Sequence, residues 1–158
     1  MPLIECRTLF NQKKLIPLDK LVQRPSAYGI ILSEGQILLA KATITQKYVL
    51  PGGGIEIGES NEVALRREVW EETGAEVEVA RLLHFETDFF YYDPLDSAVH
   101  GFLVFYQCFV TKLAFSQPNY PPEEDLDMAL WVDIADLKAE AFQSHGEIAL
   151  RLIEQCRT

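Results

Sequence analysis

PGGGIEIGESNEVALRREVWEETGA, residues 51–75, holds the densest concentration of glycine and carboxylate in the chain. Pro51 lacks a backbone donor, and residues 52–54 are glycines, which can adopt φ > 0 and let a ligand approach the main chain closely. Ser60 is a typical N-cap, good helix formers follow it as far as Thr73, and Gly74 is a typical helix stop. The stretch therefore predicts a loop over residues 51–54 and a helix from Ser60 to Thr73.

Three carboxylates share one face of this predicted helix, because Glu68, Glu71 and Glu72 stand at i, i+3 and i+4. Only Glu71 has a basic neighbour at helical spacing, Arg67. Each like-charge pair on a helix costs about 0.2–0.5 kcal/mol, and a bound hard cation such as Mg²⁺ would remove that cost. An acidic, solvated helix face is the alternative, and the three glutamates alone leave both interpretations open.

The spacing of the surrounding residues resembles the Nudix box of the Nudix (MutT-type) hydrolase family, glycine-x5-Glu-x7-Arg-Glu-aliphatic-x-Glu-Glu-x-Gly-aliphatic. Ala75 is smaller than the aliphatic residue usual at the last position. The resemblance implies an α/β fold, the Nudix α/β/α sandwich, with a mixed β-sheet and a loop-helix-loop catalytic motif. The matching residues are Gly53, Glu59, Arg67, Glu68, Val69, Glu71, Glu72, Gly74 and Ala75.

The resemblance also implies a reaction, in which water attacks a phosphorus of a nucleoside diphosphate linked to another moiety. Divalent cations neutralise such phosphate oxygens and acidify a bound water, so Mg²⁺ is the expected cofactor, with Mn²⁺ as a substitute. Arg67 matches the arginine that orients the glutamates, and Glu59 matches an earlier glutamate behind the metal ligands. The implied metal ligands are Glu68, Glu71, Glu72 and the backbone carbonyl of Gly53.

The general base and the substrate stay open at this point. A box glutamate or a glutamate of a later loop is the base in this family, and residues 123–125 (Glu-Glu-Asp) offer such a loop, with Glu124 as the candidate. Arg24 is a candidate for holding a terminal phosphate, or else a surface arginine. Tyr91 and Tyr92 lie where tyrosine accompanies dinucleoside polyphosphate hydrolysis in some family members, although they also suit an ordinary strand end.

Several functions fit these residues. The leading one is Mg²⁺-dependent hydrolysis of a nucleoside triphosphate, a nucleotide sugar or an ADP-ribose-like compound. A dinucleoside polyphosphate is an alternative substrate. A nucleotide sensor that binds without turnover is an alternative from another class, although such proteins are expected to have eroded boxes. Isomerase chemistry on an isoprenoid diphosphate is known from relatives of this fold, but no feature of this sequence calls for it.

Composition limits the class of protein. The 158 residues fit one domain, 1–158, and a hydrophobic share of 48% is enough for a core. A formal charge of −10 argues against duplex nucleic acid as a partner. No stretch approaches the roughly 20 apolar residues needed to cross a bilayer. The three cysteines form no metal-binding pattern, so reduced thiols in a cytoplasmic protein are expected.

The rest of the chain predicts the parts of one mixed sheet with a helix on either side. Residues 1–24 predict one or two short strands, an extension that either packs on the domain or forms a homodimer; monomer and homodimer both remain open. Leu65 and Val69 are predicted to lie on one buried flank of the helix, and Val63 and Trp70 on another. Strands are predicted over 28–42 (a hairpin turning at 33–35), 47–50, 76–90, 100–115 and 129–132, with helical segments at 134–137 and 146–155.

Overall fold

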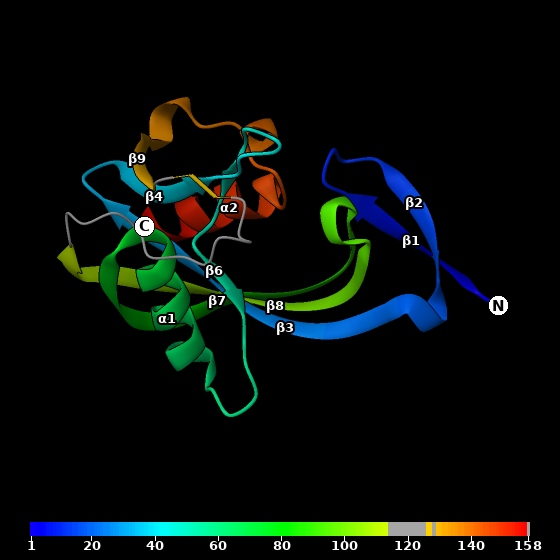
Figure 1. Cartoon of the computed structure of the whole chain (residues 1–158). Coiled ribbons are helices and arrows are strands. Elements are labelled where there is room, and N and C mark those ends of the chain that lie inside the picture. The colour runs from blue at the N-terminus through cyan, green and yellow to red at the C-terminus, as the bar shows by residue number, and fades with distance from the viewer. Residues whose placement is uncertain (114–125, 128, 158) are drawn as a thin grey trace.

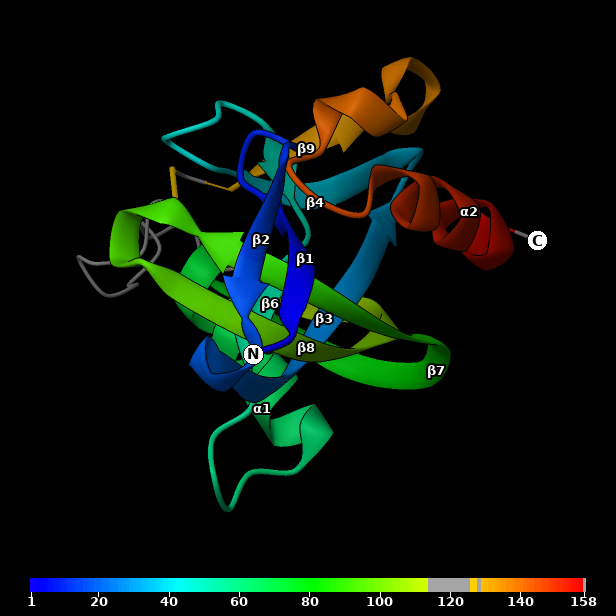
Figure 2. The same ribbon diagram turned by 90° about the vertical axis from the view of Figure 1, so that its right-hand side faces the viewer.

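The computed structural model describes residues 1–113, 126, 127 and 129–157, and shows a mixed sheet with one α-helix on each face (Figures 1 and 2). This confirms the predicted α/β/α sandwich. The order of hydrogen-bonded strands is β2-β1-β7-β8-β3-β4-β5, with β6 paired to β3 and β9 paired to β4. In chain order the elements are β1 (Leu3–Thr8), β2 (Lys13–Pro17), β3 (Leu21–Ser33), β4 (Gln36–Lys41), β5 (Tyr48–Val49), β6 (Gly52–Gly54), α1 (Asn61–Thr73), β7 (Ala75–Tyr92), β8 (Ser97–Leu113), β9 (Leu130–Asp133) and α2 (Gly146–Arg157).

The long strands β3, β7 and β8 form the centre of the sheet. Strand β8 lies antiparallel to β7 and parallel to β3, which confirms the predicted central position of the apolar strand. Strand β3 begins at Leu21, seven residues before the predicted start at Tyr28. The prediction failed there because Pro25 has no N–H and its neighbours are polar, yet the Pro25 carbonyl still accepts a hydrogen bond from Ile55 N at 3.0 Å.

Each helix covers its own hydrophobic core. Helix α2 packs Leu152 and Ile153 onto sheet residues such as Ile30 and Phe105. Helix α1 packs Leu65 and Val69 onto the opposite face, against residues that include Ile31, Val77 and Cys108. The buried apolar side chains therefore fix both helices against the sheet. Within the described residues no helix is long and apolar enough to cross a membrane.

Helix α1 has the ends that the sequence predicts. Ser60 Oγ accepts a hydrogen bond from Val63 N at 3.2 Å, and Gly74 ends the helix in the left-handed conformation at φ 73°. Trp70 is 45% exposed and Val63 is 54% exposed, so the prediction that this flank is buried is wrong. The sheet covers only the flank that carries Leu65 and Val69, and Trp70 lies outside that contact.

The first two strands form a hairpin that extends the sheet at the end of β7 (Figure 1). Strand β1 runs parallel to β7, with Arg7 opposite Phe90 and Thr8 opposite Tyr91. Cys6 and Ile16 are buried against Tyr91 of β7. The apolar side chains left exposed on residues 1–24 include Leu3, Phe10, Leu15, Leu18 and Val22. Dimerisation through this segment stays a prediction.

The glycine run is a strand where the sequence predicts a loop. Strand β6 pairs antiparallel with β3, placing Gly52 opposite Tyr28 and Gly53 opposite Ala27. A Cβ on Gly52 would lie only 2.1 Å from the Ala27 carbonyl oxygen, and the φ of Gly52 is 146°. Glycine is needed here because two backbones approach more closely than any side chain allows.

Candidate active site

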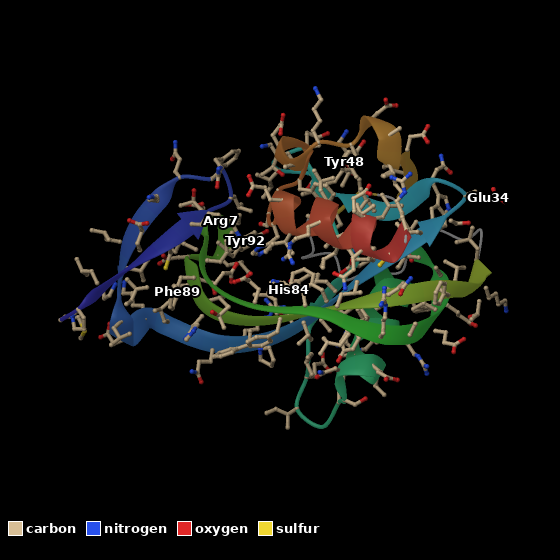
Figure 3. All side chains as sticks on the ribbon, turned by 180° about the vertical axis from the view of Figure 1, so that it is seen from behind. Arg7, Glu34, Tyr48, His84, Phe89 and Tyr92 are labelled. Carbon is tan, nitrogen blue, oxygen red and sulfur yellow. The ribbon has the colours of Figure 1, made fainter. Side chains whose placement is uncertain are left out.

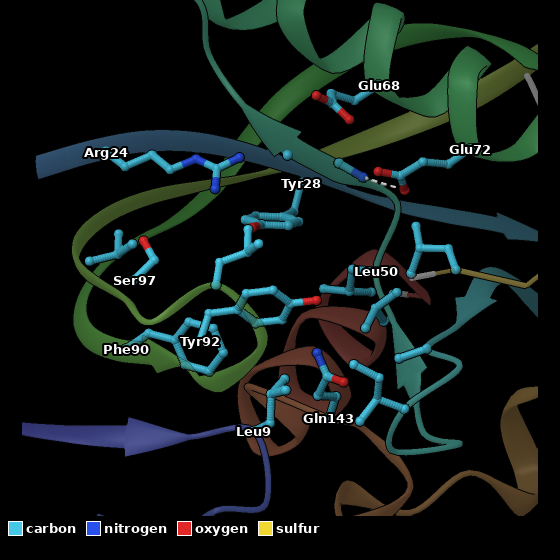
Figure 4. A pocket seen from close by; sticks show the side chains of 18 residues that line it. Leu9, Arg24, Tyr28, Leu50, Glu68, Glu72, Phe90, Tyr92, Ser97 and Gln143 are labelled. Atoms are coloured by element: carbon cyan, nitrogen blue, oxygen red, sulfur yellow. Dashed lines mark hydrogen bonds between the residues drawn. The ribbon is translucent and has the colours of Figure 1, made fainter. Parts of the chain in front are cut away.

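A cavity of about 390 Å³ opens between helix α1, strand β6 and the ends of β7 and β8. Figure 4 shows Arg24 and Tyr28 between the α1 carboxylates and the aromatic rings at the end of β7. Cavities of about 300–1,000 Å³ are typical of small-molecule sites. The wall residues used below are Arg24, Tyr28, Glu68, Glu72, Phe90 and Tyr92.

Glu68 and Glu72 bring two buried carboxylates to this cavity. They are 7% and 3% exposed, and they lie one helical turn apart on α1. Gly52 N donates to Glu72 Oε2 at 3.3 Å. A Cβ on Gly53 would lie 2.8 Å from Glu68 Cδ, so the glycine leaves room for the carboxylate. The glycines of β6 thus allow the helix to present both side chains at the cavity.

Arg67 joins the loop before α1 to the helix. Its guanidinium donates to both carboxylate oxygens of Glu59, at 2.7 and 2.8 Å, and to the Gly54 carbonyl at 3.1 Å. It also contacts Glu68 at 3.0 Å and Glu71 at 3.4 Å. The hydrogen bonds that Arg67 donates to Glu59 lower the pKa of Glu59 to about 2, and the same bonds raise the pKa of Arg67. This geometry fits the orienting role that the resemblance implies for Arg67.

Glu71 stands apart from the other two glutamates. It does not line the cavity, and burial, followed by the nearby charge of Glu68, raises its pKa. Across the described residues no three His, Cys, Asp or Glu side chains converge closely enough to form a metal site. Mg²⁺ is commonly held by only one or two carboxylates plus substrate phosphates. Glu68 and Glu72, which line the cavity, therefore fit a hard cation. The roles of Glu71 and of the Gly53 carbonyl as further ligands stay predictions.

Only some of the predicted substrate residues line the cavity. Arg24 lines the cavity, where its Nη2 would lie 2.7 Å from a Cβ on Gly54, and Tyr92 lines it as well. Tyr91 faces the other side of β7, because successive strand residues point to opposite faces. Its hydroxyl donates to Asp96 Oδ1, and its ring is buried beneath the N-terminal hairpin. The loop candidate Glu124, like its neighbours at 123 and 125, lies outside the described residues.

Many wall residues were not predicted as site residues, among them Tyr28, Phe90 and Gln143. Tyr28 and Phe90 read as ordinary apolar strand residues in the sequence, and Gln143 follows no motif. The sheet topology brings Tyr28 of β3 and Phe90 of β7 to the cavity, and the segment before α2 brings Gln143. A pattern local to the chain therefore had no means of identifying them.

Replacing Arg67 by glutamine is expected to raise the pKa of Glu59 from about 2 toward its ordinary value of about 4.3, although the N–H of Glu56 still donates to the carboxylate. Because the pKa is depressed in the folded protein, Glu59 contributes stability above about pH 4.3 that is lost as the pH falls toward about 2. NMR titration of the Glu59 carboxyl carbon and acid unfolding measure both effects. Arg66→Gln removes an exposed neighbouring charge as the control. Equal titration of Glu59 in the two variants would contradict the assignment.

Comparison with known proteins gives the family. The family model for the NUDIX domain matches residues 22–152. A Caenorhabditis elegans protein described as a nudix hydrolase is 30% identical over 119 residues, which are 75% of this chain but only 29% of that protein. The chain thus matches less than a third of that relative's length.

Solved structures share the fold. An ADP-ribose pyrophosphatase from Streptococcus suis superposes with a TM-score of 0.62 at 21% identity, covering 85% of this chain and 92% of the other. A UDP-X diphosphatase gives a TM-score of 0.60 at 18% identity, covering 87% and 65%. Together with the family match and the arrangement of the box residues around the cavity, these similarities show that the chain belongs to the Nudix hydrolase family.

Proposed function

We propose that the protein hydrolyses the pyrophosphate bond of a nucleoside diphosphate derivative with the help of Mg²⁺. The observation that carries the proposal is the pair of buried carboxylates, Glu68 and Glu72, in the wall of a cavity that also contains Arg24. Mg²⁺ is commonly held by one or two carboxylates together with substrate phosphates, and this wall offers two carboxylates with an arginine that suits phosphate. The proteins of similar fold named ADP-ribose pyrophosphatase and UDP-X diphosphatase support this class of substrate.

The charged residues of the site have separate roles in the proposed reaction. Glu68 and Glu72 hold the cation, which when bound neutralises phosphate oxygens and acidifies a water. Arg67 holds Glu68 in place through its 3.0 Å contact. Arg24 binds and orients the diphosphate, since a guanidinium matches phosphate oxygens in bidentate geometry.

The aromatic rings of Phe90 and Tyr92 offer flat apolar surfaces for the nucleobase. They stand across the cavity from the α1 carboxylates (Figure 4). A base on these rings would place the phosphates it carries toward Arg24 and α1. This separates the part of the cavity that binds the nucleoside from the part that performs the hydrolysis.

Hydrolysis of a substrate panel tests the proposal. Nucleoside triphosphates, nucleotide sugars, ADP-ribose and dinucleoside polyphosphates are incubated with Mg²⁺, with Mn²⁺ and with EDTA, and phosphate and nucleotide release are measured. Turnover is expected with either cation and is expected to cease with EDTA. Thermal stabilisation by these compounds without any turnover would contradict hydrolysis and favour a sensor.

A cytoplasmic location is part of the proposal. Cys6, Cys108 and Cys156 are all free thiols, which suits a reducing compartment. Burial raises the pKa of the Cys108 thiol to about 12, so this thiol stays protonated and unreactive at neutral pH.

A further inference from the structure

A second, smaller cavity of about 200 Å³ adjoins the first. We call it the inner chamber. Its wall contains several polar residues, among them Arg24, and at its far end Arg7, Asp88 and His145. The two cavities share wall residues, among them Arg24, Tyr28, Leu50, Phe90 and Gln143. A single ligand that passes Arg24 and Tyr28 can therefore occupy both.

Arg7, Asp88 and His145 come from three distant parts of the chain and meet at Asp88. Asp88 Oδ2 lies 3.0 Å from His145 Nε2 and 3.7 Å from Arg7 Nη2. These side chains are 20%, 17% and 25% exposed, in the order Asp88, His145, Arg7. Arg7 belongs to the N-terminal hairpin, which lies outside the region matched by the family model, residues 22–152. Figure 3 shows Arg7 close to Tyr92, where the hairpin meets the end of β7.

The backbone holds these residues in position. A Cβ on Gly101 would lie 2.6 Å from Asp88 Oδ1, so a larger residue at position 101 would displace the carboxylate. His145 has a φ of 58°, and its ring meets Phe105 edge-on at 6.3 Å. The next residue, Gly146, packs so closely on Ala139 that a Cβ would lie 2.0 Å from the Ala139 oxygen. Asp88 and His145 are thus fixed by tight packing.

The chemistry of the chamber selects its ligand. An ionised carboxylate only accepts hydrogen bonds, so Asp88 repels a phosphate and favours a group that donates. Arg7 balances the charge of Asp88, and the charge of Arg24 is used by the diphosphate, so the end of the chamber beside Asp88 suits a neutral group; Leu103 and Phe105 supply apolar walls. At about 200 Å³ the chamber is smaller than the roughly 300 Å³ at which sites for drug-sized ligands begin, so it fits a single ring rather than a second nucleoside.

We propose that the inner chamber binds a hydroxyl-bearing sugar ring on the far side of the diphosphate, with its hydroxyl groups donating to Asp88. This inference rests on the proposed hydrolysis and narrows its substrate to a nucleoside diphosphate sugar. The nucleobase lies on Phe90 and Tyr92, the diphosphate lies at Arg24, and the sugar lies beside Asp88. Arg7 and His145 position the carboxylate.

Two substrates that differ only beyond the diphosphate test this inference. One is a nucleoside diphosphate sugar, and the other is the same nucleoside diphosphate carrying a methyl ester. The wild type is expected to show a kcat/KM at least about tenfold higher for the sugar, because a site built for substrate hydroxyls discriminates against an analogue that lacks them. Asp88→Asn is expected to lower kcat/KM for the sugar about 10- to 100-fold, mainly through KM, and to change that of the methyl ester less than about threefold.

Two further variants make the test specific. Gly101→Ala should displace the Asp88 carboxylate and reproduce the selective loss without changing Asp88 itself. Glu78→Gln removes an exposed carboxylate from the same strand and should leave both substrates unaffected. Equal losses for sugar and methyl ester in Asp88→Asn, or no loss for either, would overturn the sugar subsite.

Turnover of these compounds by the wild type distinguishes the sugar subsite from the proposed hydrolysis itself. Turnover of the methyl ester or of triphosphates without a preference for the sugar would keep the hydrolysis and overturn the subsite. Failure to hydrolyse any of these compounds would remove both. A selective loss in Asp88→Asn and Gly101→Ala alone supports the sugar ring.

Discussion

Glu72→Gln is expected to lower kcat for pyrophosphate hydrolysis by about 10²–10³-fold, the size of effect seen when one preorganised charge-stabilising group is removed. Glutamine has nearly the same shape, and its side-chain oxygen can still accept the hydrogen bond from Gly52 N. The change therefore removes the negative charge that we propose to hold the cation, and it leaves the buried packing in place. Steady-state kinetics at saturating substrate and a Mg²⁺ titration measure the loss and the expected rise in the Mg²⁺ requirement.

Glu76→Gln is the matched control for this variant. Glu76 lies just beyond α1 at the start of β7, is exposed, and loses the same charge on substitution. Its kcat is expected to equal that of the wild type. A Glu72→Gln enzyme that retains most of its activity would contradict the metal-binding role, and so would an equal loss in both variants.

Gly52→Ala is expected to lower the free energy of unfolding by about 3 kcal/mol or more, at the upper end of what a strained backbone position costs. The new Cβ would lie 2.1 Å from the Ala27 oxygen and 2.7 Å from Tyr28 Cα, both backbone atoms that cannot rotate away. Strand β6 has to move off β3, which removes their paired hydrogen bonds and the contact from Gly52 N to Glu72. Urea unfolding measures the stability, and hydrolysis measures the loss of the site.

Gly58→Ala is the control that distinguishes the steric contact between β6 and β3 from the cost of a positive φ alone. Gly58 has a φ of 93°, but no atom lies within 4 Å of the position a Cβ would take. Its substitution is expected to lower the free energy of unfolding by only about 1 kcal/mol, because the added side chain is strained at positive φ but contacts nothing. Equal destabilisation by the two substitutions would show that the contact between β6 and β3 is unimportant.

The local sequence predicted features whose causes are local. Ser60 and Gly74 mark both ends of α1 because an N-cap hydroxyl and a left-handed glycine act within a few residues of their own position. Glu68 and Glu72 reach one side of the helix for the same reason, since i and i+4 share a face. The burial of Trp70 was predicted wrongly, because helical periodicity alone does not show which flank meets the sheet.

Features that depend on contacts between distant segments could not be predicted from local sequence patterns. The glycines of β6 are equally compatible with a loop and with a strand. They form a strand because they pair with the neighbouring β3. Arg7, Asp88 and His145 share no motif and meet only after the sheet has been assembled. The carboxylates that we propose as the metal site were thus predictable from one helix, whereas the surface that we propose selects the substrate was not.

The parallel pairing of β3 with β8 has a consequence for refolding kinetics. Leu21 lies beside Ala98, so the part of β3 that carries Arg24 finds its partner only after a long chain segment has closed. Contacts between residues so far apart in sequence form slowly, whereas a capped helix such as α1 forms from local contacts. During refolding, the helical signal in circular dichroism should therefore appear before binding of the proposed nucleotide substrate returns, because that binding needs the wall of the cavity that carries Arg24.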